Sequence, residues 1–236
     1  MRKLLAIWLR KILTIVGKTV GKKSSSSPGA YALKICPDLV KGLEKCVSKG
    51  IIVTCGTNGK TTTNNLMASA LEAKGYKVIC NKLGANMLSG IATTVLQEMS
   101  IFGKLKADYA CLEIDEAYTP IVFDYVKPDV MVITNLFRDQ LDRYGEIDIT
   151  SDIIKRAIKK VPNLKLVLNG DDPLCVQFGR EENVKAYYYG ISEKVLPQLD
   201  DTKEGRFCPV CGEEQKYNYY HYSQLGDFYC PSCGFK

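Results

Sequence analysis

The sequence predicts an α/β protein with a mostly parallel P-loop sheet that is flanked by helices. Short apolar segments alternate with amphipathic segments between residues 51 and 169, a pattern typical of strand–helix–strand units. The turn GTNGKTTT joins the first apolar segment to the first amphipathic one. Several later apolar segments end in carboxylate or amide side chains, at the edge where such sheets bind ligands.

The composition is that of an ordinary globular protein, with 46% apolar and 25% charged residues in a chain of 236. This length suggests one or two domains with a sizeable core. The net charge is +6, but the first 23 residues hold seven basic side chains and no acidic one, so the remainder is nearly balanced. The charge therefore gives no indication of a nucleic-acid-binding protein.

Ten cysteines in a chain without a cleavable signal pattern indicate a reducing compartment. Four of them form a separate pattern near the C-terminus, and Cys36 lies in a less regular stretch. The other five lie in apolar stretches and are interpreted as small core residues: Cys46, Cys55, Cys80, Cys111 and Cys175.

Residues 1–23 predict a basic amphipathic helix. Its basic residues, including Lys3, Arg10 and Lys18, recur near one face. The Arg10-Lys11 pair interrupts the apolar core that a signal peptide needs, and the segment is too short and too charged to span a bilayer. Two interpretations stay open with equal weight: a helix on an anionic membrane surface, or a helix docked on the protein's own first domain. The apolar face would consist of Leu5, Trp8, Leu9, Ile12 and Val16.

Residues 24–49 predict a linker and a lead-in helix. The composition KKSSSSPG at 22–29 is typical of a linker. A helix is expected from Pro37 to Lys49, with Pro37 in its first turn and several apolar side chains on one face. The expected division is therefore 1–23, the N-terminal helix; 24–49, the linker and lead-in helix; 50–204, an ATP-binding domain; and 205–236, a zinc ribbon.

The segment Ile51–Thr63 carries a phosphate-binding motif. Residues 51–54 are expected to form a buried strand, and Lys60 to open a helix. The N–H groups of the turn and the helix N-terminus would point at phosphate oxygens. Lys60 would face the β- and γ-phosphates of ATP, and the Thr61 hydroxyl would bind Mg²⁺. Thr54 replaces the first glycine of the general Walker pattern, so the loop is a variant; the alternative is a chance glycine-rich turn. The expected nucleotide-binding residues are Gly56, Thr57, Asn58, Gly59, Lys60, Thr61 and Thr62.

The rest of the sheet follows from alternation of strand and helix patterns. The segment KLGANMLS at 82–89 is expected to be a loop. Strands are expected at 77–81, 108–113, 129–134 and 164–169, and helices at 90–97 and 148–160.

Glu113 ends the strand expected at 108–113. A carboxylate at the tip of a strand next to the P-loop strand is placed to bind the same Mg²⁺ as Thr61. Asp115 and Glu116 crowd this tip, and a cluster of like charges favours a bound cation. The alternative is a plain carboxylate at the edge of the sheet. We predict the metal-binding role.

Two CxxC motifs near the C-terminus predict a Cys₄ zinc site. Eighteen residues separate them, which is within the range of zinc ribbons, and each is followed by glycine. Four thiolates close the coordination shell, so the metal would be structural. His221 lies between the motifs and is interpreted as an exposed strand residue rather than a ligand. Aromatic side chains of a ribbon can also stack on nucleic acid, but this interval carries few basic residues. The expected ligands are Cys208, Cys211, Cys230 and Cys233.

The loop variant GTNGKTTT resembles that of the Mur ligase superfamily. The order GTNGKTTT, LGANMLSG, LEIDEA, TNLFRDQLDRYGEID, LNGDDP and a Cys₄ ribbon is similar to one branch of it, the ligase-like subunits of lipid II isoglutaminyl synthase. The resemblance covers essentially the whole chain, including the HYSQLG stretch within the ribbon. It implies a Mur ligase middle domain with the ribbon as an insertion.

This resemblance also implies a function. Family members use ATP to activate the α-carboxyl of D-glutamate in the stem peptide of lipid II, through an acyl phosphate. Ammonia from a GatD-like glutaminase partner then forms D-isoglutamine. Lys60, with Mg²⁺ held by Thr61 and Glu113, would screen the two reacting anions, which makes Lys60 and Glu113 the expected catalytic residues. The implied location is the cytoplasm, in a heterodimer that does not bind nucleic acid. A place at the inner face of the membrane would follow only from the first of the two interpretations of residues 1–23.

Two family features are in doubt here. A histidine that helps to bind a second magnesium in the superfamily is replaced by Gln140, whose carbonyl oxygen is a weaker ligand. Several members carry a carbamylated lysine at about the position of Lys155, but nothing else marks this residue, and we predict no such role for it. The turn Asn169–Pro173 resembles the family's Asn-Ala-Asp-Asp-Pro turn and can be purely structural.

Family members continue past the ribbon, back into the middle domain and into a C-terminal domain that closes on ATP. The sequence stops at Lys236, so a truncated or fragmentary member with weak nucleotide binding and no complete amidation is expected. Two other functions stay open: another Mur-type amide ligase that adds an amino acid, and a non-catalytic nucleotide- and zinc-binding module. Nucleic-acid binding is the weakest interpretation.

Overall fold

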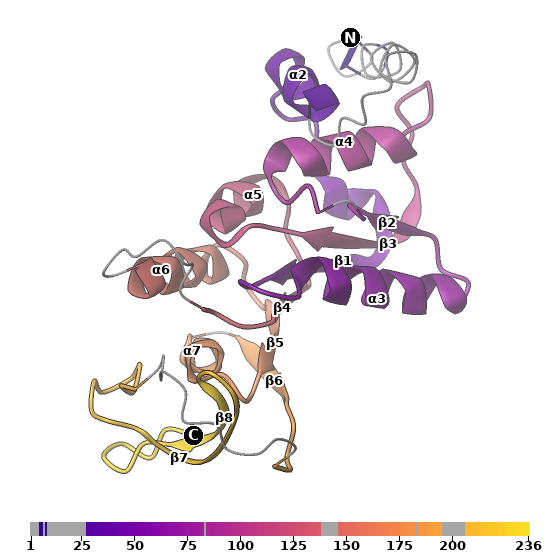
Figure 1. The fold of residues 1–236 in the computed structure, drawn as a ribbon. Coiled ribbons are helices and arrows are strands. Elements are labelled where there is room, and N and C mark those ends of the chain that lie inside the picture. The colour runs from indigo at the N-terminus through magenta and orange to yellow at the C-terminus, as the bar shows by residue number, and fades with distance from the viewer. Residues whose placement is uncertain are drawn as a thin grey trace.

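A six-stranded parallel sheet forms the centre of the computed structural model, with helices on both faces (Figure 1). The structure describes residues 5, 6, 8, 27–82, 84–137, 146–182, 184–194 and 206–236. The strand order β2-β3-β1-β4-β5-β6 confirms the predicted α/β sheet. The strands are β1 (Val47–Cys55), β2 (Val78–Cys80), β3 (Ala107–Glu113), β4 (Val130–Ile133), β5 (Lys165–Asn169) and β6 (Lys185–Tyr189).

Helices cover both faces of this sheet because its strands are apolar on both sides. Helix α3 (Lys60–Ala73) lies on one face, and α4 (Leu88–Glu98) and α5 (Thr119–Tyr125) lie on the other (Figure 1). Helix α6 (Glu146–Lys159) packs beside α5. The buried core includes Ile51, Val53, Leu112 and Met131, all without exposed surface.

The strand register brings three loops to one edge of the sheet. Thr54 of β1 pairs with Glu113 of β3, and Cys55 pairs with Ile133 of β4. The three central strands therefore end together, and the segments that follow them meet at their carboxyl ends. Ligands bind at this edge in parallel α/β sheets, so the register determines where the candidate site lies.

The predictions for residues 22–49 are wrong in two places. Residues 27–29 were expected to belong to a linker, but they begin helix α2 (Ser27–Ile35). This helix packs closely on α4: a Cβ added to Gly29 would lie 1.9 Å from the Ser89 carbonyl oxygen. Tertiary packing therefore overrides the linker-like composition. The expected helix 37–49 is absent from this described stretch, which contains turns and the short 3₁₀ helix η1 (Leu43–Lys45).

Backbone conformation explains the missing lead-in helix. Gly42 has φ +78°, in the left-handed region, which a right-handed helix cannot contain. Strand β1 then begins at Val47, four residues before the expected strand. Apolar side chains that could have formed a helical face are buried in the main core without such a helix: Leu39, Val40, Leu43 and Val47.

The other strands and helices are confirmed to within a few residues, and several elements were not predicted. The additional ones are α5, β6, the 3₁₀ helix η2 (Glu116–Tyr118), and helix α7 (Pro173–Val176) with the 3₁₀ helix η3 (Gln177–Arg180). Among the predicted core cysteines, Cys55, Cys111 and Cys175 are buried, whereas Cys46 and Cys80 are half-buried.

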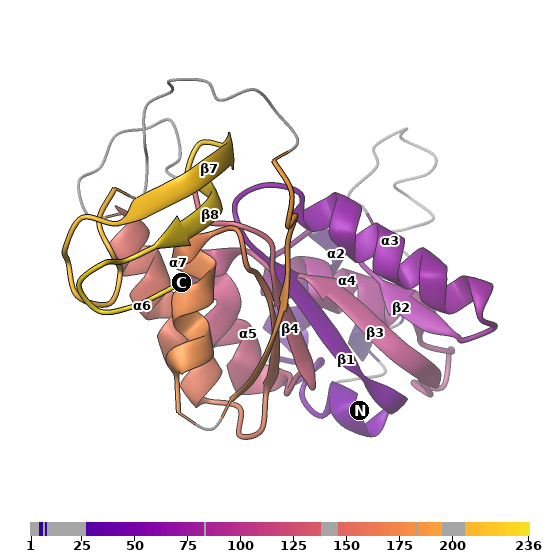
Figure 2. The ribbon, with the colours of Figure 1, turned by 90° about the horizontal axis from the view of Figure 1, so that it is seen from below.

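A small antiparallel hairpin, β7 (Lys216–Tyr222) and β8 (Leu225–Tyr229), forms the body of the C-terminal ribbon. It lies beside α7 (Figure 2), where Val176 packs in one cluster with Phe228 and Phe235. The predicted N-terminal helix lies outside the described residues, apart from positions 5, 6 and 8. No helix in the described part of the chain is long and apolar enough to cross a bilayer.

Candidate functional site: a phosphate cradle and a Cys₄ cluster

The GTNGKTTT turn forms a loop at the carboxyl end of β1, and α3 begins at Lys60 as predicted. Gly56 has φ +125°, and a Cβ there would lie 2.3 Å from Thr134 Oγ1, so only glycine fits. Gly59, at φ +78°, forms the N-cap of α3. Asn58, Gly59 and Thr62 are exposed, and the N-terminus of α3 is open to an incoming anion.

The loop is held by the segment that follows β4. The Thr57 backbone N–H donates to the Asn135 carbonyl oxygen over 2.8 Å, and the Asn58 N–H donates to Asn135 Oδ1 over 2.8 Å. The Phe137 N–H donates to Thr57 Oγ1 over 2.9 Å. These contacts fix the loop before any ligand binds. Sequence reasoning missed Asn135, because its role depends on a neighbouring strand rather than on local spacing.

Lys60 points into the loop, where it meets a carboxylate. Its Nζ lies 3.1 Å from Glu116 Oε1, and the same oxygen accepts the Gly56 N–H over 2.6 Å. Burial raises the pKa of Glu116, and the nearby Lys60 opposes this shift. Glu116 therefore occupies the donors that a phosphate oxygen would use. This pairing was not predicted, although Glu116 was noted at the tip of the strand.

Thr61 and Glu113 lie together, as expected of residues that share a metal ion. Thr61 Oγ1 donates to Glu113 Oε2 over 2.7 Å, and Glu113 is 2% exposed. Two oxygen ligands that are adjacent on Mg²⁺ lie about 3 Å apart, so the pair fits such an ion. Gly84, at φ +69°, passes close to it: a Cβ there would lie 3.3 Å from Thr61 Oγ1. The metal-binding role stays a prediction.

The three acidic residues of LEIDEA do not converge on one point. Glu113 contacts Thr61, Glu116 contacts Lys60, and the Asp115 side chain accepts the Ala117 N–H at the start of η2. The 3₁₀ turn thus directs the three carboxylates to different partners, although the charge of Asp115 still helps to raise the pKa of Glu116.

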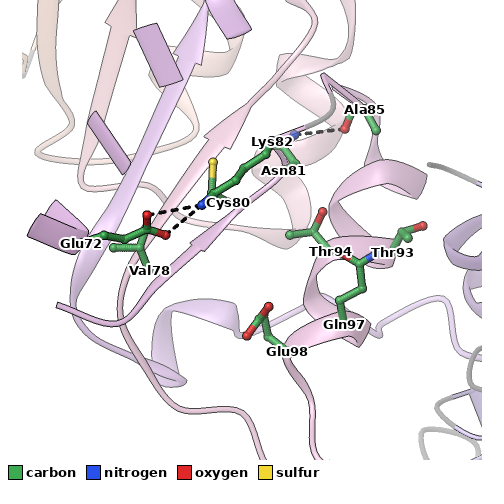
Figure 3. A pocket seen from close by; sticks show the side chains of 10 residues that line it. All are labelled: Glu72, Val78, Cys80, Asn81, Lys82, Ala85, Thr93, Thr94, Gln97 and Glu98. Carbon is green, nitrogen blue, oxygen red and sulfur yellow. Dashed lines mark hydrogen bonds and ion pairs between the residues drawn. The ribbon is translucent and has the colours of Figure 1, made fainter. Parts of the chain in front are cut away.

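Asn81, which follows β2, fixes the end of β3 at Glu113. Its Oδ1 accepts the Glu113 N–H over 2.8 Å, and its Nδ2 donates to the Glu113 carbonyl oxygen over 2.9 Å. The same Nδ2 donates to the Ala85 carbonyl oxygen over 3.0 Å (Figure 3). Asn81 thus links the KLGANMLS loop to the backbone of the predicted metal ligand.

A polar pocket of about 300 Å³ opens beside Asn81, between α3, β2 and α4 (Figure 3). Two of its lining residues, Lys82 and Glu72, form an ion pair at 3.0 Å. The Cys80 thiol in its wall is neutral, because burial raises its pKa to about 11. The lining is Glu72, Val78, Cys80, Asn81, Lys82, Ala85, Thr93, Thr94, Gln97 and Glu98.

The LNGDDP turn has a structural role, because its side chains hydrogen-bond to the backbone of neighbouring segments. Asp172 is fully buried and accepts the N–H groups of Leu136 and Leu174 over 2.9 and 3.0 Å. Burial raises its pKa to about 6, against the effect of these donors. Asn169 Nδ2 donates to the Thr134 carbonyl oxygen over 2.9 Å. Residues 169–173 therefore hold residues 134–136 in place, and Asn135 of that segment holds the phosphate loop.

The four predicted zinc ligands lie together. Their sulfurs are all within 4.8 Å of one another, with Sγ–Sγ distances of 3.7 Å for Cys208–Cys233 and 3.5 Å for Cys211–Cys230. Sulfurs bound to one tetrahedral Zn²⁺ lie about 3.8 Å apart, so the residues fit a zinc ion. The Cys233 N–H bonds to the Cys230 sulfur and helps to lower that thiol's pKa to about 7.

Three further residues were considered as possible metal ligands or modified residues: His221, Lys155 and Gln140. His221 lies on β7 but is only half-exposed, and its Nε2 is 3.2 Å from the Ile191 carbonyl oxygen. It is outside the sulfur cluster, as predicted. Lys155 lies on α6, partly exposed. Gln140 lies outside the described residues, so the question of a second metal is not tested.

Comparisons with known proteins identify the family of this chain. The family model "Mur ligase middle domain" matches residues 53–229. The chain is 38% identical, over all 236 residues, to the subunit MurT of lipid II isoglutaminyl synthase (glutamine-hydrolyzing) from Staphylococcus aureus strain COL, covering 52% of that protein. The MurT subunit of Streptococcus pneumoniae strain R6 is 39% identical over 91% of this chain and 47% of its own length.

Solved structures show the same fold. MurF from Acinetobacter baumannii matches 69% of this chain and 35% of its own with a TM-score of 0.55 at 17% identity. MurF ligase from Thermotoga maritima in complex with ADP gives a TM-score of 0.53 at 18% identity, over 69% of this chain and 37% of its own. The chain spans about half the length of the curated relatives that it matches.

Proposed function

The chain belongs to the Mur ligase family through its middle domain, and from this we propose that it carries the ATP-binding domain of a MurT-type ligase subunit. The reaction is the ATP-dependent amidation of the D-glutamate α-carboxyl in the stem peptide of lipid II, which yields D-isoglutamine for peptidoglycan synthesis. The single observation that carries this proposal is the 38% identity to a MurT subunit along the whole chain.

ATP is the proposed nucleotide. A neighbour of the same fold was solved with ADP, and the N-terminus of α3 in this chain, at Gly59 to Thr61, offers its backbone N–H groups to an anion. Lys60 Nζ already lies on an anionic oxygen, that of Glu116. When phosphates enter, they take over this cation and the Gly56 N–H from Glu116.

The chemistry needs a site that holds two anions together. A carboxylate oxygen of the substrate attacks the γ-phosphorus, the bond to ADP breaks, and an acyl phosphate forms. Lys60 stabilises the charge on the transferred group. Thr61 and Glu113 would hold Mg²⁺, which supplies further screening of the phosphate oxygens when bound. Ammonia then attacks the acyl carbon, and phosphate leaves with its bonding electrons.

A glutaminase partner of the GatD type is the proposed source of ammonia. Glutamine hydrolysis by a cysteine needs a thiolate, whereas burial raises the pKa of the Cys55 and Cys175 thiols well above the usual range. The single histidine, His221, faces the Ile191 carbonyl oxygen. Among the described residues the partner of this histidine is thus a backbone oxygen and not a cysteine sulfur, so we propose that a separate subunit hydrolyses glutamine. The proposed location is the cytoplasm, at the inner face of the membrane.

The first test is nucleotide binding. ADP with Mg²⁺ should bind to the wild-type chain and lose at least tenfold in affinity in Lys60→Ala, measured by calorimetry. Lys74→Ala is the matched control, because Lys74 is exposed at the other end of the same helix. Equal affinities in wild type and Lys60→Ala would overturn the cradle assignment.

The second test is turnover. With lipid II, ATP, glutamine and a glutaminase partner, the product should show the mass of an acid-to-amide exchange. Incorporation of an added amino acid instead of ammonia would indicate another Mur-type ligase. ADP binding with no amidation in this complete mixture would favour a nucleotide- and zinc-binding module.

A further inference from the structure

One residue at the tip of the ribbon hairpin, Gln224, is buried against the main domain. Ser223 and Gln224 form the two-residue turn between β7 and β8, and Gln224 has no exposed surface. Hairpin tips normally lie in solvent. Here Gln224 Nε2 donates to the Leu136 carbonyl oxygen over 2.7 Å. Its amide also bonds to the Asp172 carboxylate. The HYSQLG stretch therefore has a role other than metal binding, because its Gln224 connects the hairpin to the main domain.

Leu136 belongs to the segment that holds the phosphate loop. The next residue, Phe137, donates its N–H to Thr57 Oγ1 over 2.9 Å, and that hydroxyl lies 3.3 Å from the Phe137 carbonyl oxygen. The Phe137 ring also packs edge-on against Tyr222, with 5.8 Å between ring centroids. A path of direct contacts thus runs from Gln224 and Tyr222, through residues 136 and 137, to Thr57.

The ribbon is itself fixed to the main domain at its other end. Phe235, just after the last cysteine of the cluster, packs with Val176 of α7, and the Arg180 guanidinium lies 5.0 Å from the Phe235 ring centroid. The Gly226 N–H donates to the Asp171 carbonyl oxygen over 2.9 Å. The ribbon can therefore hold the hairpin tip in place, provided that its own fold is intact.

We infer that the hairpin tip positions the phosphate loop, so that metal binding at the Cys₄ cluster and nucleotide binding at the loop strengthen each other. A filled cluster keeps the hairpin rigid, Gln224 and Tyr222 keep residues 136 and 137 in place, and these keep Thr57 and the phosphate loop in the observed conformation. Such coupling is reciprocal by thermodynamic necessity. The inference rests on the proposed function only in taking the loop as a nucleotide site.

The decisive variant is Gln224→Met, which keeps the length of the side chain and removes its N–H donor. The affinity for ADP with Mg²⁺ should fall about five- to tenfold, with the zinc content unchanged. Asn218→Ala is the matched control, because Asn218 is exposed on the same hairpin and its amide donates across the hairpin to Asp227. Since Gln224 is buried, Tyr222→Leu serves as a second variant: Tyr222 is 66% exposed, so the change cannot empty a core.

Zinc removal tests the reciprocal direction. A chelator should weaken ADP binding in the wild type by more than in Gln224→Met, and ADP should slow the transfer of zinc to the chelator only in the wild type. Unchanged ADP affinity in both Gln224→Met and Tyr222→Leu would overturn the inference.

Hydrogen exchange separates this result from a failure of the proposed function. Backbone amides of 55–61 and 135–137 should exchange faster in Gln224→Met and after zinc removal, without any nucleotide present. If these amides respond but ADP does not bind, the hairpin tip does position the loop, and it is the proposed nucleotide site that fails. If they do not respond in either case, the coupling is wrong.

Discussion

Glu116 Oε1 lies 3.1 Å from Lys60 Nζ inside the loop that we assign to phosphate binding. The carboxylate also accepts the Gly56 N–H. It thus uses both the cation and a backbone donor that phosphates need. Because the 15% exposure of each side chain limits solvent screening, the negative charge of Glu116 competes with an incoming nucleotide.

Glu116→Gln should tighten ADP binding. The neutral amide keeps an oxygen for the Gly56 N–H but removes the charge that opposes the phosphates. We expect affinity to rise about tenfold, equivalent to ~1.4 kcal/mol, in a calorimetric titration. Asp115→Asn is the control, because Asp115 lies one residue away and contacts Ala117 rather than Lys60. Weaker binding in Glu116→Gln would show instead that the carboxylate helps to hold the nucleotide.

The two glycines of the loop should differ in their tolerance of alanine. In Gly56→Ala the new Cβ would meet Thr134 Oγ1 at 2.3 Å and the Asn135 carbonyl oxygen at 2.8 Å. We expect a loss of about 2–4 kcal/mol in the free energy of unfolding, together with weaker nucleotide binding. Gly59→Ala meets nothing within 4 Å, so only its left-handed φ costs energy, about 1 kcal/mol. Equal losses in a urea titration would contradict the geometry.

Motifs whose functional residues lie close together in the sequence could be predicted from the sequence alone. The phosphate loop and the two CxxC pairs need only a few residues at fixed intervals, and Thr61 could be matched to Glu113 because strand tips meet at one edge. The Lys60–Glu116 pair was not predictable, since it depends on how the η2 turn directs a side chain 56 residues away.

Features that depend on packing between distant segments were also not predicted from the sequence. Ser27 to Gly29 look like a linker by composition, yet they begin a helix because α4 offers a surface that only a glycine can approach. Gln224 sits in a polar turn, where sequence patterns predict exposure. Its burial follows from the docking of the ribbon on α7, which no local pattern encodes.

The stability of the chain should depend on pH through Asp172. Burial raises the pKa of this carboxyl to about 6, from its ordinary value of 3.8. The folded state therefore holds the proton more tightly than the unfolded state, so the free energy of unfolding should fall as pH rises from about 4 to 6. The shift corresponds to about 3 kcal/mol at most. Asp172→Asn, which cannot titrate, should flatten this part of the profile in urea titrations. An unchanged slope would assign the pH dependence to other groups.

The Cys₄ cluster should hold one zinc ion per chain, because four sulfurs within 4.8 Å of one another match a closed tetrahedral site. Cys230→Ser should lose the metal, measured by elemental analysis, and should unfold the ribbon first, since the cluster adjoins the small apolar core of Phe228 and Phe235. Cys36→Ala is the control, because Cys36 is a free thiol outside the cluster.

A cobalt-substituted wild type should show intense sulfur-to-cobalt absorption that Cys230→Ser lacks. Full zinc content in Cys230→Ser would mean that the metal is bound elsewhere.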